Sequence, residues 1–171
     1  MKPIVEIALN RIEKDPASFA EMSSIERGIH QIVMEAVTRD PSLIRFASTR
    51  MRDDLDVMLA VVRQDGLLIR YASKRLRNHP VLAKAAATEN PEALMWMGEK
   101  AQNCPEIVKV AVKRDAHAVR HALAKPRRDL SVAELVIKSD PAAARYLSPM
   151  VQSAPAIVSL KRSMSKLRAI A

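Results

Sequence analysis

Arginine side chains recur along this chain at fixed distances from a repeated polar residue. An aspartate or asparagine returns every 25 residues, and the fifth and twelfth residues after it are mostly arginine. The basic residues of these two columns are Arg27, Arg45, Arg52, Arg70, Arg77, Arg120, Arg127 and Arg145, and Lys74 lies between Arg70 and Arg77. Because a guanidinium group binds carboxylates and phosphates through paired hydrogen bonds, the pattern predicts a basic ridge that binds an acidic partner.

A ring stands at the sixth residue after each repeated aspartate or asparagine except the first, and a cation usually follows four residues later. The rings are Phe46, Tyr71, Trp96, His121 and Tyr146, and the cations are Arg50, Arg75, Lys100 and Lys125. Residues four apart are neighbours on a helix, so the pattern predicts cation–π contacts between the two columns. It also fits rings packed at the edge of the core beside solvated cations. The fourth repeat interrupts the basic columns with Met95, Glu99 and Gln102.

Signals for catalysis or metal binding are weak. His117 and His121 lie four residues apart, a spacing that can bind a metal, but no glutamate between them completes a metalloprotease motif and no third ligand is evident. Cys104 precedes an expected helix without an identifiable base. Three glycines leave little scope for a phosphate-binding loop. We therefore expect no enzyme, no catalytic or metal site, no cofactor and no small-molecule substrate.

The repeated aspartates are expected to start helices. These marker residues are Asp15, Asp40, Asp65, Asn90, Asp115 and Asp140, with Ser165 as a degenerate seventh. Their side chains can accept hydrogen bonds from the first turn of a helix, and the proline that follows four of them suits the first helical position. Pro80, Pro105 and Pro155 are expected to start the preceding helices in the same way. Each repeat is then a helix of about ten residues, a tight turn and a second helix of similar length.

Apolar residues hold constant places in every repeat. The position eight before the marker is Ile7, Ile32, Val57, Leu82, Ile107, Val132 and Ile157, and similar columns stand three before and four after it. Short amphipathic helix pairs must stack on one another to bury such residues. The sequence thus predicts an all-α protein, a right- or left-handed α-solenoid of six to seven helix–turn–helix repeats. It forms one domain, residues 1–171, with units at about 3–27, 28–52, 53–77, 78–102, 103–127 and 128–152 and a cap at 153–171.

Composition narrows the location and the partners. The net charge of +9 favours an acidic protein surface or nucleic acid. The lone cysteine rules out an intrachain disulfide framework and favours a reducing compartment. No apolar stretch is long enough to predict a transmembrane segment, and no signal peptide is recognised. We expect a cytoplasmic protein, with secretion by a signal-independent route left open.

One block resembles a known family. The segment from Val57 to Ser73, with Asp65-Gly66-Leu67 at its centre and Tyr71-Ala72-Ser73 at its end, is similar to a helical-repeat domain of unknown function found in bacterial, amoebal and algal proteins. Phe46-Ala47-Ser48 matches the same closing tripeptide. The resemblance covers most of the chain and is sharpest from about residue 30 to 80. It implies an all-helical repeat fold and carries no catalytic residues and no substrate.

Two functions remain open from the sequence. The first is a non-enzymatic module that binds a protein across a ridge on the second helices, using Arg45, Arg70, Arg120 and Arg145 beside Tyr71 and Trp96. The second is a nucleic-acid-binding protein that uses the same columns without reading the base sequence. Salt separates the two, because binding to a phosphate backbone weakens steeply as ionic strength rises.

Overall fold

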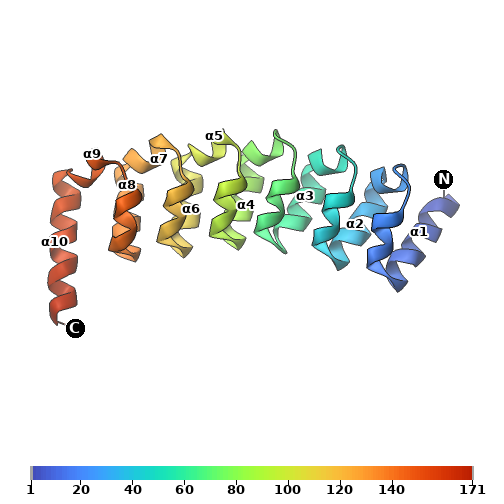
Figure 1. Ribbon diagram of the computed structural model, residues 1–171, viewed down its shortest axis with the longest axis horizontal. Helices are drawn as coiled ribbons and strands as arrows, with labels where there is room; N and C mark the ends of the chain where they lie inside the picture. Colours follow the sequence, from blue (N-terminus) through green and yellow to red (C-terminus); the bar gives the residue numbers. More distant parts are fainter. Residues whose placement is uncertain (1, 171) are drawn as a thin grey trace.

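The protein is all-helical and elongated. The computed structural model describes residues 2–170, with side chains from Pro3 to Ser165, and contains no strand within that range. Helices stand side by side in the order of the sequence, and the two ends of the chain lie at opposite ends of the molecule (Figure 1). Within the described residues, no helix has both the length and the apolar character needed to cross a membrane. The all-α prediction is confirmed.

The same order of elements recurs along the chain: an α-helix, a six-residue 3₁₀-helix and a short helix. The α-helices are α1 (Lys2–Lys14), α2 (His30–Arg39), α3 (Leu55–Val62), α4 (Pro80–Glu89), α6 (Pro105–Arg114), α8 (Leu130–Ser139) and α10 (Pro155–Ile170). The 3₁₀-helices are η1 (Pro16–Glu21), η3 (Pro41–Phe46), η5 (Gly66–Tyr71), η7 (Pro91–Trp96), η8 (Ala116–His121) and η9 (Pro141–Tyr146). The short helices are η2 (Glu26–Gly28), η4 (Met51–Asp53), η6 (Leu76–Asn78), α5 (Glu99–Gln102), α7 (Ala124–Arg128) and α9 (Pro149–Gln152).

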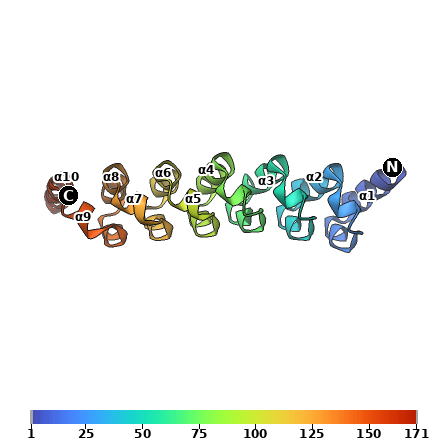
Figure 2. The same cartoon turned by 90° about the horizontal axis from the view of Figure 1, so that it is seen from above.

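Each α-helix together with the 3₁₀-helix and the short helix that follow it is called a unit here and is named after its α-helix. The α-helices form one row and the 3₁₀-helices a second row beside it (Figure 2). Neighbouring members of each row are in contact along the molecule. Residues at the same place in successive units therefore line up on the surface.

The marker residues act as caps, as predicted. Asp40 accepts a hydrogen bond from the Ser42 amide at 2.9 Å, and the other five markers bond the amide two residues ahead in the same way. Five of the six also end the preceding α-helix, as when the Asp40 amide donates to the Ala36 carbonyl, whereas α3 ends at Val62, before Asp65. The predicted seventh marker is wrong. Ser165 lies inside α10, where its hydroxyl donates to the Lys161 carbonyl.

The prediction of a second helix of about ten residues is also wrong, because the second helix stops at the ring residue. After Phe46, Ala47 turns to an extended conformation and is buried. The Ser48 amide then donates to the Arg27 carbonyl of the preceding unit at 3.0 Å, so it cannot continue a helix. The Ser48 hydroxyl accepts from the Met51 amide and begins the short helix. The ring-Ala-Ser tripeptide is therefore a helix stop and a new helix start.

The core follows the predicted columns with one exception. The residues eight and three before each marker and four after it are buried from Phe19 to Ile157. Ile7 belongs to the first of these columns but is 60% exposed, which corrects its predicted place in the core. Among the described residues, α1 contacts one other α-helix of the row, α2, whereas the α-helices from α2 to α8 have a neighbouring α-helix on each side. The Ile7 side chain consequently lies on the end of the row.

Candidate binding surface

Three arginines lie over the ring of the next residue in the chain. The guanidinium carbon is 4.6 Å from the ring centre for Arg45 and Phe46, and 4.9 Å for Arg70 and Tyr71. Arg145 lies 5.1 Å from the ring of Tyr146. We call these three the Arg–ring pairs. Each pair ends a 3₁₀-helix, and each arginine is exposed. At such sites a cation–π contact contributes about 0.5–1 kcal/mol.

The predicted cation–π partners four residues after the rings are therefore wrong. The chain bends between the ring and that cation, so the two do not share a helix. Arg75 instead contacts Asp53 of the preceding unit, with 3.1 Å between Nε and Oδ1. The Ser73 hydroxyl, followed by the Arg75 guanidinium, holds the pKa of Asp53 below its ordinary value. Lys74 is exposed beside this cluster.

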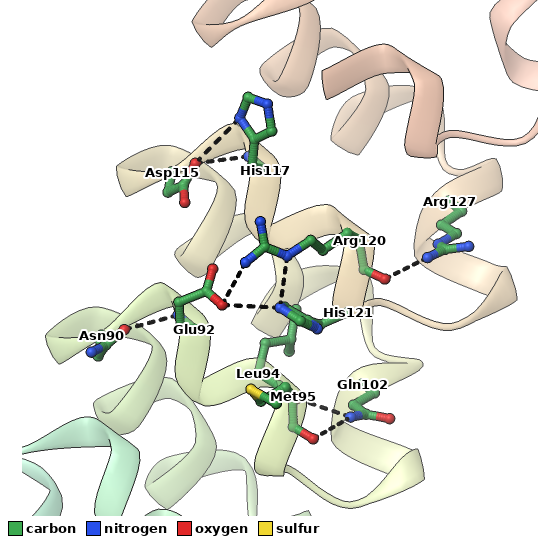
Figure 3. Close-up of polar contacts among 10 residues, drawn as sticks. All are labelled: Asn90, Glu92, Leu94, Met95, Gln102, Asp115, His117, Arg120, His121 and Arg127. Atoms are coloured by element: carbon green, nitrogen blue, oxygen red, sulfur yellow. Dashed lines mark hydrogen bonds and ion pairs between the residues drawn. The ribbon is translucent and has the colours of Figure 1, made fainter. Parts of the chain in front are cut away.

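The row of Arg–ring pairs is interrupted in its middle. Trp96 and Met95 take the place of a pair in the α4 unit and are 37% and 44% exposed. In the next unit Arg120 is paired with Glu92, at 2.7 Å, and the same carboxylate contacts His121 at 3.1 Å (Figure 3). The charge of Arg120 is thereby largely balanced. Unbalanced guanidinium groups thus lie toward the two ends of the row.

The arginines twelve residues after the marker are half-buried and do not belong to the exposed ridge. Arg52, Arg77 and Arg127 were predicted on one face with the exposed arginines, but they lie on the short helices and are half-buried. Arg127 donates to the Arg120 carbonyl at the end of its own 3₁₀-helix (Figure 3). Gln102, at the equivalent place, donates to the carbonyls of Leu94 at 2.9 Å and Met95 at 3.3 Å. Gln102 therefore donates to the end of the 3₁₀-helix of its unit, as Arg127 does, and it does not interrupt a binding column.

Contacts between units contain residues that the sequence analysis did not select. The Asn78 carboxamide accepts from the Lys100 amide at 2.9 Å, and Asn103 accepts from the Lys125 amide at 3.0 Å. Both bonds begin short helices whose unit lacks the capping serine, since Gly98 stands at its place in one and a leucine in the other. The sequence signal for these contacts is the column thirteen residues after the marker, which is polar in every unit except the first and also contains Asp53.

The two histidines and the cysteine do not form a reactive cluster. His117 Nδ1 lies 3.7 Å from Asp115 and 3.6 Å from Asp140, with its ring edge-on to Tyr146. His121 contacts Glu92 instead, so the two rings have different neighbours (Figure 3). Cys104 is half-buried before α6. Among the described residues, no three His, Cys, Asp or Glu side chains are arranged to hold a metal ion.

Comparison with known proteins identifies one segment. Residues 30–77 match the family described as "Domain of unknown function (DUF4116)". The matched segment runs from the start of α2 to η6 and contains the first two Arg–ring pairs. No curated protein and no solved structure matches the chain. The structure and the comparison together define an all-helical protein that contains a domain of unknown function.

Proposed function

We propose that the chain is an α-solenoid of six to seven repeats that binds a protein partner and is not an enzyme. The proposed contact surface is the edge formed by the ends of the 3₁₀-helices, with Arg45 and Arg70 as its principal contacts. The observation that supports it is the pair of exposed guanidinium groups held over Phe46 and Tyr71 in adjacent units. The proposed location is the cytoplasm, in keeping with a single unpaired cysteine.

The Arg–ring pairs suit the recognition of acidic side chains. A ring beneath the guanidinium restricts its rotamers but leaves its N–H groups at the rim available for a carboxylate. Restricting a long side chain in advance lowers the entropy lost on binding. In stacked repeats the same position recurs at regular intervals, which produces an extended surface. The partner we infer is therefore a protein with an acidic face or segment.

A double variant tests this proposal. Arg45→Ala/Arg70→Ala should lose most of the proteins that the unaltered chain captures from its own cells. The matched control is Arg63→Ala/Lys113→Ala, which removes two exposed charges, one directly after α3 and one within α6. It should keep the captured set. Equal loss in both variants would show a general effect of charge and would contradict the proposal.

Nucleic acid is the alternative outcome. A phosphate-backbone binder with a net charge of +9 should hold labelled duplex or single strand at low salt and lose it as salt rises. Tight binding of that kind, together with no specific protein capture, would replace the proposed function. The ion pair of Arg120 with Glu92 favours the protein partner, because a phosphate backbone would meet a carboxylate in the middle of the row.

A further inference from the structure

A hollow of about 350 Å³ lies where the α1 unit meets the α2 unit, and it is lined by basic and hydroxyl side chains. Its lining residues are Ser24, Arg27, Arg45, Phe46, Ala47, Ser48, Thr49 and Arg52. None of these is acidic. Arg27 donates to the Phe46 carbonyl at 3.3 Å, while Nε of Arg52 has no hydrogen-bond partner in the described part of the chain. Three guanidinium groups thus surround a space with no carboxylate in its lining.

The junction between the α2 and α3 units contains a bound carboxylate. There the carboxylate of Asp53 accepts hydrogen bonds from the Ser73 hydroxyl and from Arg75 Nε. Arg75 also donates to the Asp53 carbonyl at 2.7 Å. A serine and an arginine two residues apart therefore form a carboxylate site, filled by a side chain of the preceding unit.

The first junction has the same site without the carboxylate. The residues one repeat earlier, 25 positions back, are Ser48 in place of Ser73, Arg50 in place of Arg75 and Gly28 in place of Asp53. The backbone register is the same, because the Ser48 amide donates to Arg27 and the Ser73 amide donates to Arg52, both at 3.0 Å. Glycine supplies no side chain, so Ser48 has no carboxylate beside it like that of Asp53, and Arg50 is exposed two residues further along the chain.

Space is available at Gly28. A Cβ built on it would meet nothing nearer than the Ser48 hydroxyl, at 3.6 Å. That hydroxyl accepts from the Met51 amide at 3.4 Å, and its own hydrogen has no acceptor among the described residues. An outside oxyanion can therefore approach Ser48 where Asp53 approaches Ser73.

We propose that this junction binds an oxyanion, either a carboxylate or a phosphate group. Ser48 donates through its hydroxyl and Arg50 through its guanidinium, as Ser73 and Arg75 do for Asp53. Arg27, Arg45 and Arg52 supply the surrounding positive charge. That the oxyanion belongs to an acidic side chain of a partner rests on the proposed function, but the binding of a free anion does not.

Amide ¹⁵N–¹H spectra recorded during titration with sodium phosphate, and separately with sodium acetate, test the proposal at constant ionic strength. We expect saturable shifts at Gly28, Ser48 and Thr49 with at least one probe, and the tighter probe identifies the preferred source. Weak shifts that do not saturate and spread over all exposed basic residues would overturn the proposal.

Two substitutions at Gly28 separate the site from general charge. Gly28→Asp places a carboxylate where Asp53 lies in the next unit and should weaken anion binding by about tenfold or more. Gly28→Ala is the matched control. Its added Cβ lies at an ordinary van der Waals distance from the Ser48 hydroxyl, so this variant should bind the anion as the unaltered chain does. Undiminished binding by Gly28→Asp, folded by circular dichroism, would refute the assignment.

The reverse substitution gives a gain of binding. Asp53→Gly empties the second junction and should produce a second set of saturable shifts at Ser73 and Lys74. Failure of a folded Asp53→Gly variant to gain this site would also count against the proposal. Both titrations use only the chain and a simple salt, so their result is independent of whether the chain captures a protein partner.

Discussion

Adding a single methyl group at Gly66 should destabilise the protein, although the place after a marker usually carries a larger residue. A Cβ on Gly66 would lie 2.5 Å from the Ala86 carbonyl oxygen and 3.0 Å from the Asn90 nitrogen. Both atoms are backbone, and they form the last hydrogen bond of α4, at 2.8 Å.

The size of the effect follows from two opposing terms. Overpacking against backbone that must move costs about 1–3 kcal/mol. Replacing glycine by alanine restricts the unfolded chain and returns about 0.4–1 kcal/mol. The expected net loss for Gly66→Ala is about 1–2 kcal/mol, which lowers the melting temperature of a chain of this length by about 2–8 °C.

Gly28→Ala is the matched control, because it adds the same methyl group in the short helix η2, where the surroundings are open. Its Cβ meets the Ser48 hydroxyl at an ordinary 3.6 Å. This variant should gain about 0.4–1 kcal/mol. Urea unfolding followed by circular dichroism measures both variants, and faster hydrogen exchange of the Asn90 amide should accompany Gly66→Ala. A Gly66→Ala variant as stable as the unaltered chain would refute the reasoning.

Three further outcomes are expected. Gln102→Ala removes a donor from the Leu94 and Met95 carbonyls at the end of η7, of which the first keeps a bond from the Met97 amide, and should lose about 0.5–1.5 kcal/mol in urea unfolding. Arg127→Gln keeps a donor at the equivalent place, and its free energy of unfolding should change by less than about 0.5 kcal/mol. The lowered pKa of Asp53, due to Ser73 and then Arg75, stabilises the folded state above the ordinary value of 3.8, and this contribution is lost as pH falls through the lowered folded value. Asp53→Asn should therefore be less stable than the unaltered chain near neutral pH and approach it in strong acid. A difference in the free energy of unfolding between the two proteins that stays constant from neutral pH to strong acid would contradict the lowered pKa of Asp53.

The helix caps and the buried columns could be predicted from the sequence, because they depend on the residue types within a single repeat. An aspartate followed by proline caps a helix whatever surrounds it, so the capping roles of Asp40 and Asp140 follow from the residue types alone. The buried columns followed from the same period. Ile7 was misplaced for a related reason: its burial depends on a neighbouring unit, which a residue's own repeat does not encode.

The second helix could not be predicted because its end depends on another unit. Ser48 fits the interior of a helix by spacing alone, yet its amide is bonded to the preceding unit and its hydroxyl starts the next helix. The break between ring and serine separates Arg45 from Arg52, which a continuous helix would have placed together. The exposed ridge and the half-buried arginines are thus distinct sets, and a sequence column cannot tell them apart.

The residues that replace arginine in the fourth repeat differ in their effect on the surface charge. Gln102 replaces an arginine without loss of contact, so it says nothing about binding. Met95 and Glu92, in contrast, remove positive charge from the exposed edge, one by its type and the other by pairing with Arg120. Arg45 and Arg70 lie in adjacent units, and Arg45 also lines the hollow between the α1 and α2 units, whereas Arg145 is separated from them by Met95 and the Arg120–Glu92 pair. A partner that recognises charge should therefore contact the α2 and α3 units first, and substitutions around Arg145 should matter less than those at Arg45.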